Sequence, residues 1–106
     1  MSTSWIYLIA AILFEVSGTT CMKLSQGFTK IGPSILIVVF YGLCFTFLTL
    51  ALKKLEVSVA YSVWAGLGTV LIAIIGIVWF RESATFMKLM SIALIIMGVI
   101  GINASQ

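Results

Sequence analysis

Long apolar runs alternate with short polar stretches along the whole chain. The apolar runs cover residues of about 5–22, 31–52, 57–80 and 84–103. At a rise of roughly 1.5 Å per residue, helices of this length match the hydrocarbon core of a bilayer, which is about 30 Å thick. The pattern predicts an all-α integral membrane protein, in which residues 1–106 form a single membrane domain of four transmembrane helices joined by short turns into an up-and-down bundle.

Composition supports the membrane prediction and argues against a nucleic-acid partner. Hydrophobic residues make up 62% of the chain and charged residues 8%, whereas soluble domains carry about 25% charged residues. The net charge is +3, but the six basic residues are scattered near the ends of the apolar runs. Nucleic-acid binding needs a clustered basic patch and is not expected. The first run lacks a basic leader and a cleavage site, so we expect it to be retained as a helix.

One acidic residue interrupts the first apolar run. Glu15 lies in its middle, and Lys23 is about two helical turns away. An ionised carboxylate at this depth costs several kcal/mol unless it is paired, hydrated or protonated. Ionisable residues inside membrane helices are therefore candidates for function. The alternative is a glutamate that holds helices together through hydrogen bonds.

Small and aromatic residues surround this position in the predicted helices. Gly18 and Thr19 share the face of Glu15 and leave room for a helix, water or ligand. In the third helix Tyr61 and Trp64 share a face. The remaining candidates are Tyr41 in the second helix, and Gly66 and Gly68, which mark a place to bend or to be closely approached.

Charge and small residues suggest how two copies combine. Lys23, Lys30, Arg81 and Lys88 fall on one side of the membrane, and Lys53 and Lys54 on the other. This bias is weak, so insertion in both orientations is allowed, although it favours both termini outside. Ser91 and Gly98 form a small-residue stripe on the fourth helix, which we interpret as a dimer interface in preference to packing within one chain. An antiparallel homodimer would build an inverted repeat around a midplane site.

A carboxylate among aromatic rings is suited to an organic cation. The faces of Trp64, Tyr61 and Tyr41 offer cation–π attraction of about 1–2 kcal/mol each when desolvated. If protons and cations compete for Glu15, alternate occupancy drives proton–cation antiport. No cofactor or metal is expected, because the chain has no histidine, and Cys21 and Cys44 are interpreted as packing thiols.

These residues resemble the pattern of a known protein family. The chain resembles the small multidrug resistance transporters over nearly its whole length, through four matching stretches: Glu15-Val-Ser-Gly-Thr-Thr-Cys-Met-Lys23, Gly27-Phe-Thr-Lys-Ile-Gly-Pro33, Ala60-Tyr-Ser-Val-Trp-Ala-Gly-Leu-Gly68 and Gly98-Val-Ile-Gly-Ile-Asn103. The resemblance implies an antiparallel, dual-topology homodimer in a bacterial cell membrane that exports cations in exchange for protons. It implies that Glu15 is the shared proton and substrate carboxylate, and that Tyr7 lines the same cavity.

The resemblance also bears on the substrate. Members that export guanidinium look like Glu-Val-x-Trp after the carboxylate, with serine in the second helix and lysine at the chain end, where this sequence has Gly18, Cys44 and Asn103. The Gly-Thr-Thr run and Tyr41 look like the quaternary-ammonium branch, and a missing tryptophan would widen the cavity for bulky cations. Phe80-Arg81-Glu82 looks more like the guanidinium branch. The alternatives are therefore a guanidinium exporter and, from another class, a non-transporting membrane subunit.

Overall fold

A computed structural model describes residues 3–105 and contains four α-helices. They are α1 (Thr3–Leu24), α2 (Ile31–Ala51), α3 (Val57–Val78) and α4 (Phe86–Ala104). Each is long and apolar enough to cross a membrane. The four predicted spans are confirmed, although their ends differ by up to two residues. At α4, for example, the helix begins after Thr85, whose hydroxyl accepts a hydrogen bond from the Lys88 N–H at 3.1 Å.

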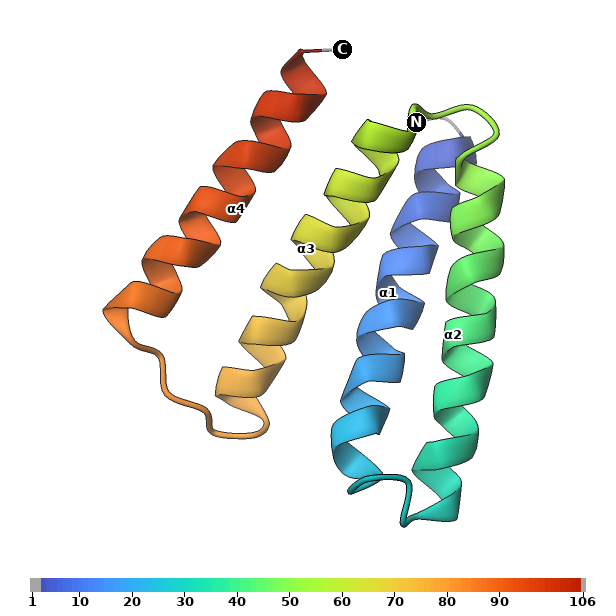
Figure 1. Ribbon diagram of the computed structural model, residues 1–106, viewed down its shortest axis with the longest axis vertical. Coiled ribbons are helices and arrows are strands. Elements are labelled where there is room, and N and C mark those ends of the chain that lie inside the picture. The colour runs from blue at the N-terminus through green and yellow to red at the C-terminus, as the bar shows by residue number, and fades with distance from the viewer. Residues whose placement is uncertain (1–2, 106) are drawn as a thin grey trace.

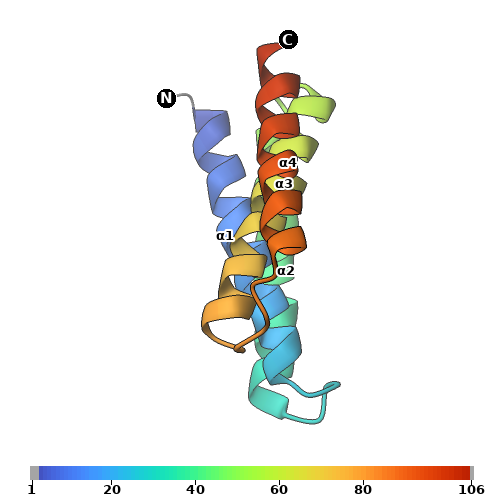
Figure 2. The same ribbon diagram turned by 90° about the vertical axis from the view of Figure 1, so that its left-hand side faces the viewer.

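The helices stand side by side in the order α2, α1, α3, α4 (Figure 1). The pairing of α1 with α2 is the most extensive, and α3 contacts α1 on one side and α4 on the other. The described chain measures 43 × 35 × 19 Å, and Figure 2 shows its thin side. No residue of α4 is buried. The single chain is thus an open row of helices with one face of α4 uncovered.

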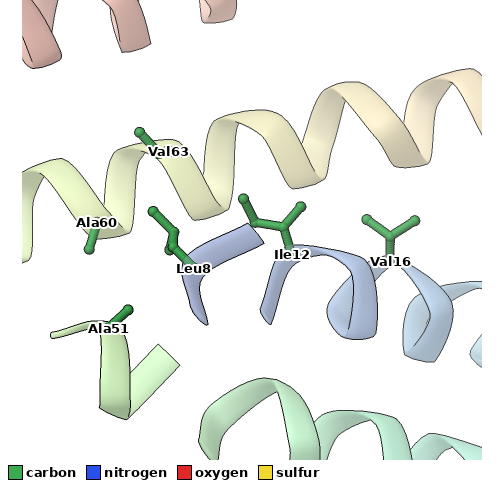
Figure 3. Packing of buried hydrophobic residues seen from close by; sticks show 6 residues of the cluster. All are labelled: Leu8, Ile12, Val16, Ala51, Ala60 and Val63. Carbon is green, nitrogen blue, oxygen red and sulfur yellow. The ribbon is translucent and has the colours of Figure 1, made fainter. Parts of the chain in front are cut away.

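The core lies between α1 and α3. Leu8, Ile12 and Val16 extend from α1 toward α3, where Ala60 and Val63 belong to the same buried cluster (Figure 3). The spacing of four residues keeps the α1 side chains on one face. Lipid tails are as apolar as leucine, so this core stabilises the fold through close contact and not through expulsion of water.

The connections between the helices distribute the basic residues between the two ends of the bundle as the sequence predicts. The α1–α2 turn and the α3–α4 loop lie at one end of the helices, and the α2–α3 turn lies at the other (Figure 1). Lys23, Lys30, Arg81 and Lys88 therefore share an end, opposite Lys53 and Lys54. Which end faces the cytoplasm stays a prediction.

Glycines in α3 and α4 have different surroundings. α3 continues as one helix through Gly66 and Gly68, and a bend there stays a prediction. A Cβ at Gly66 would collide with a Cγ2 methyl of Val99 on α4, so this glycine brings the two helices together. Gly98, by contrast, faces no atom of residues 3–105 within 4 Å. Gly98 and Ser91 are exposed, which leaves the predicted dimer interface free for a second copy.

The chain reverses its direction directly after α3. Arg81 has a φ of 58°, the left-handed conformation usually taken by glycine at helix ends. A non-glycine residue there costs about 1–3 kcal/mol. The Glu82 N–H then donates to the Gly76 carbonyl at 3.0 Å. The strained backbone at Arg81 therefore places Glu82 back against α3.

Candidate functional site

Glu15 points from α1 toward the backbone of α3. Its side chain is half-buried. A Cβ atom on Gly68 would lie 2.8 Å from Oε2 of Glu15. Gly68 is therefore the residue of α3 that makes room for the carboxylate, because any larger residue would overlap it.

One oxygen of this carboxylate is held by a short chain of hydroxyl groups. Thr19, one turn after Glu15, donates to Oε1 at 3.1 Å. The Thr19 hydroxyl also lies 2.5 Å from the Tyr41 hydroxyl. The Thr19 hydroxyl has a single hydrogen, which it donates to Glu15 in the first bond. Tyr41 is therefore the donor in the second bond.

Other hydroxyls in α1 behave differently. Those of Ser17 and Thr20 donate to the backbone carbonyls of Leu13 and Val16, at 2.8 and 2.9 Å. Such bonds to the preceding turn satisfy a hydroxyl within its own helix. Thr19 instead donates to the carboxylate, so hydrogen bonds bring Thr19 and Tyr41 together with Glu15. Their role in binding stays a prediction.

Glu15 also lines a cavity beside α3. The cavity has a volume of about 200 Å³ and is lined by Glu15, Trp64, Ala65, Gly68, Thr69 and Ile72. Oε2 of Glu15 and Nε1 of Trp64 are both buried, and neither has a hydrogen-bond partner within residues 3–105. Buried polar atoms are nearly always paired. The two residues that carry this unpaired acceptor and this unpaired donor thus line one cavity, which we call the Glu15 cavity.

Aromatic rings extend from this cavity across α2 and α3. The ring of Trp64 lies 5.5 Å from that of Tyr61, edge to face, and 6.4 Å from that of Phe45. Phe45 in turn lies 6.0 Å from Tyr41. Phe45 thus links the predicted aromatic residues, and sequence reasoning did not include it in the site. The signal was available, because Phe45 follows Tyr41 by one helical turn.

Tyr61 lies beside the Glu15 cavity and not in its wall. Its side chain is 58% exposed. Within one chain Tyr61 packs on Trp64, and its role in cation binding stays a prediction.

Two predicted site residues have other positions. Tyr7 does not reach the Glu15 cavity, because eight residues turn it by about 80° from Glu15 on the helix. Its ring packs 5.7 Å from that of Phe47 on α2. Gly18 is buried beneath the Tyr41 ring, and a Cβ there would lie 2.6 Å from a carbon of that ring. The absence of a side chain at Gly18 thus admits the Tyr41 ring, and a wider cavity for bulky cations stays a prediction.

The sequence profile of the Small Multidrug Resistance protein family matches residues 3–95. The chain belongs to this family. Among its relatives is YvaE of Bacillus subtilis, described as an uncharacterized membrane protein, which is 55% identical over 100 residues, or 94% of this chain and 84% of YvaE.

Two other relatives of this Small Multidrug Resistance protein carry more informative names. The quaternary ammonium compound-resistance protein QacF of Klebsiella aerogenes is 44% identical over 100 residues, or 94% of this chain and 91% of QacF. The multidrug resistance protein EbrA of Bacillus licheniformis is 40% identical over 105 residues, or 99% of this chain and 100% of EbrA. Four apolar helices and these relatives identify a multi-pass bacterial membrane protein.

Proposed function

We propose that this protein exports quaternary ammonium and other lipophilic cations in exchange for protons, without enzymatic chemistry. The observation that carries the proposal is the buried Oε2 of Glu15, which has no hydrogen-bond partner within residues 3–105 and belongs to a residue that lines the Glu15 cavity. The names of QacF and EbrA are consistent with such a substrate class.

Competition between a proton and an organic cation for one carboxylate couples the transport of the two. Thr19 fixes Oε1 of Glu15, so Oε2 is the oxygen that exchanges its partner. A proton on Oε2 neutralises the carboxyl group, and an organic cation beside Oε2 neutralises it without a proton. The two states exclude one another, and the proton displaced by the cation leaves to water. The face of Trp64 adds cation–π attraction that a proton does not receive.

A second copy is part of the proposal. The Glu15 cavity, at about 200 Å³, is smaller than the pockets of about 300–1,000 Å³ that hold drug-sized ligands. A second chain in the opposite orientation would enlarge it and supply a second glutamate. The exposed faces of Ser91 and Gly98 on α4 are the proposed interface.

The size of the cavity also favours a second candidate. A site of about 200 Å³ within one chain suits guanidinium, which is small and planar. If one chain supplied the whole site, the protein would be a guanidinium–proton exporter on the same scaffold.

Transport into proteoliposomes tests the proposal and separates the candidates. We expect a pH gradient to drive uptake of tetraphenylphosphonium by the wild-type protein. Glu15→Gln should abolish coupled uptake, whereas Glu56→Gln, an exposed carboxylate at the start of α3, should retain it. Uptake of guanidinium alone would favour the second candidate. Coupled transport by Glu15→Gln would overturn the mechanism.

A further inference from the structure

A larger cavity continues from the Glu15 cavity toward one end of the helices. It has a volume of about 400 Å³ and lies between α1, α3 and α4. Thr69 and Ile72 line both cavities. Thr19, which donates to Glu15, also lines the larger one. The larger cavity, here called the outer cavity, is therefore adjacent to the site of the carboxylate.

Charged residues are concentrated where the outer cavity approaches the loops. Lys23, Glu82 and Lys88 all line it. The Lys23 ammonium lies 6.0 Å from the centre of the Phe80 ring, which holds it near this end. Two ammonium groups repel an incoming cation, and Glu82 is the acidic residue that offsets them.

The fold places Glu82 by two independent features. The left-handed backbone at Arg81 reverses the chain and directs Glu82 toward α3. There the carboxylate lies against Gly76, where a Cβ atom would collide with Oε1 of Glu82. A strained turn and a glycine that leaves room for a carboxylate are features expected of a specific placement and not of a freely moving surface glutamate. Glu82 is nevertheless exposed, so it can meet a cation arriving from water.

We propose that Glu82 attracts cations at the entrance of the outer cavity and so sets the rate at which they reach Glu15. The inference rests on the proposed function. A cleft lined by charge with low-dielectric walls focuses the electric field, and so raises or lowers the association rate of a charged ligand according to the sign of that charge. Without Glu82 the entrance would carry the two lysine charges alone.

The test is the association rate of tetraphenylphosphonium with the full-length protein in nanodiscs, followed by quenching of tryptophan fluorescence. Salt at about 0.01 M and about 1 M gives Debye lengths of roughly 30 and 3 Å. At low salt we expect Glu82→Gln to slow association about threefold or more, and the difference to shrink at high salt. The dissociation rate should change little, because Glu82 does not line the Glu15 cavity.

Matched variants separate charge from structure. Gly76→Ala displaces the Glu82 carboxylate but keeps its charge, and should therefore slow association less than Glu82→Gln does. Lys88→Gln should accelerate association, because it removes a repelling charge. Glu82→Asp should restore most of the rate, and Glu56→Gln, on the opposite end of the helices, should match the wild type.

The outcomes distinguish this inference from the proposed function. If Glu15→Gln abolishes binding while Glu82→Gln associates at the wild-type rate at low salt, the role of Glu82 is wrong and the function stands. A wild-type protein that binds no tetraphenylphosphonium or guanidinium overturns both. A slower Glu82→Gln whose deficit is unchanged at high salt also overturns the role, since attraction by charge must be screened.

Discussion

Gly18 on α1 and Tyr41 on α2 are in direct contact, with no space for a side chain between them. A Cβ atom at Gly18 would lie 2.6 and 2.7 Å from two carbons of the Tyr41 ring. This contact lets the Tyr41 hydroxyl reach Thr19, at 2.5 Å. The fit between a glycine and a ring therefore determines how the carboxylate of Glu15 is held.

Replacing Gly18 with alanine should disturb both stability and binding. The Tyr41 ring must shift, and overpacking of this kind costs about 1–3 kcal/mol. We expect a lower thermal midpoint in detergent and weaker binding of tetraphenylphosphonium. Gly42→Ala is the matched control on α2, because a Cβ there meets no atom of residues 3–105 within 4 Å. Equal effects of the two substitutions would contradict this role for Gly18.

The Tyr41 hydroxyl should contribute measurably to cation affinity. Tyr41→Phe keeps the ring but removes the donor to Thr19. A hydrogen bond contributes about 0.5–1.5 kcal/mol, so affinity measured by calorimetry should fall about 2- to 13-fold. Tyr7→Phe serves as the control, since Tyr7 packs on Phe47 outside the Glu15 cavity. A larger loss from Tyr7→Phe than from Tyr41→Phe would show that Tyr7 reaches the cation after all.

Gly68→Ala tests the position of the carboxylate without changing any charge. The added methyl group would lie 2.8 Å from Oε2 of Glu15, so the oxygen must move from its position beside Gly68. We expect proton release on addition of tetraphenylphosphonium, measured in weakly buffered solution, to be lost or strongly reduced. Gly101→Ala is the control, because a Cβ there meets no atom of residues 3–105 within 4 Å. Normal proton release by Gly68→Ala would refute the placement of Oε2.

The contact between α3 and α4 should show coupling between two residues. Gly66→Ala would bring a methyl group into Val99 and should destabilise the protein by about 1–3 kcal/mol. Val99→Ala removes the colliding methyl, so the double variant should recover part of that loss. A double-mutant cycle in denaturant measures this coupling. Purely additive effects would mean that α4 does not pack on Gly66.

Much of the fold follows from the sequence because it depends on length and hydropathy. The four spans, and the grouping of Lys23 and Arg81 at one end, need no knowledge of which helices touch. Proximity of Thr19 to Glu15 follows from one helical turn. These features are local, so the order of residues determines them.

Features that depend on contacts between helices could not be predicted. Helical periodicity identifies the face that holds Gly18 but not the residue that covers it, which is Tyr41. The same limit applies to Tyr7, since nothing in α1 alone reveals that its ring packs on Phe47 of α2. The return of Glu82 to Gly76 depends on the left-handed backbone conformation of Arg81. Arginine seldom adopts this conformation, so the amino-acid sequence does not predict it.

The two ends of the described chain emerge at the same end of the helices (Figure 1). Two copies fused head to tail through a short flexible linker would consequently be forced to insert with the same polarity. An inverted pair on one polypeptide would instead require a linker that itself crosses the membrane once. The even number of helices thus makes separate chains the simplest source of oppositely oriented partners, and a single gene can then supply both.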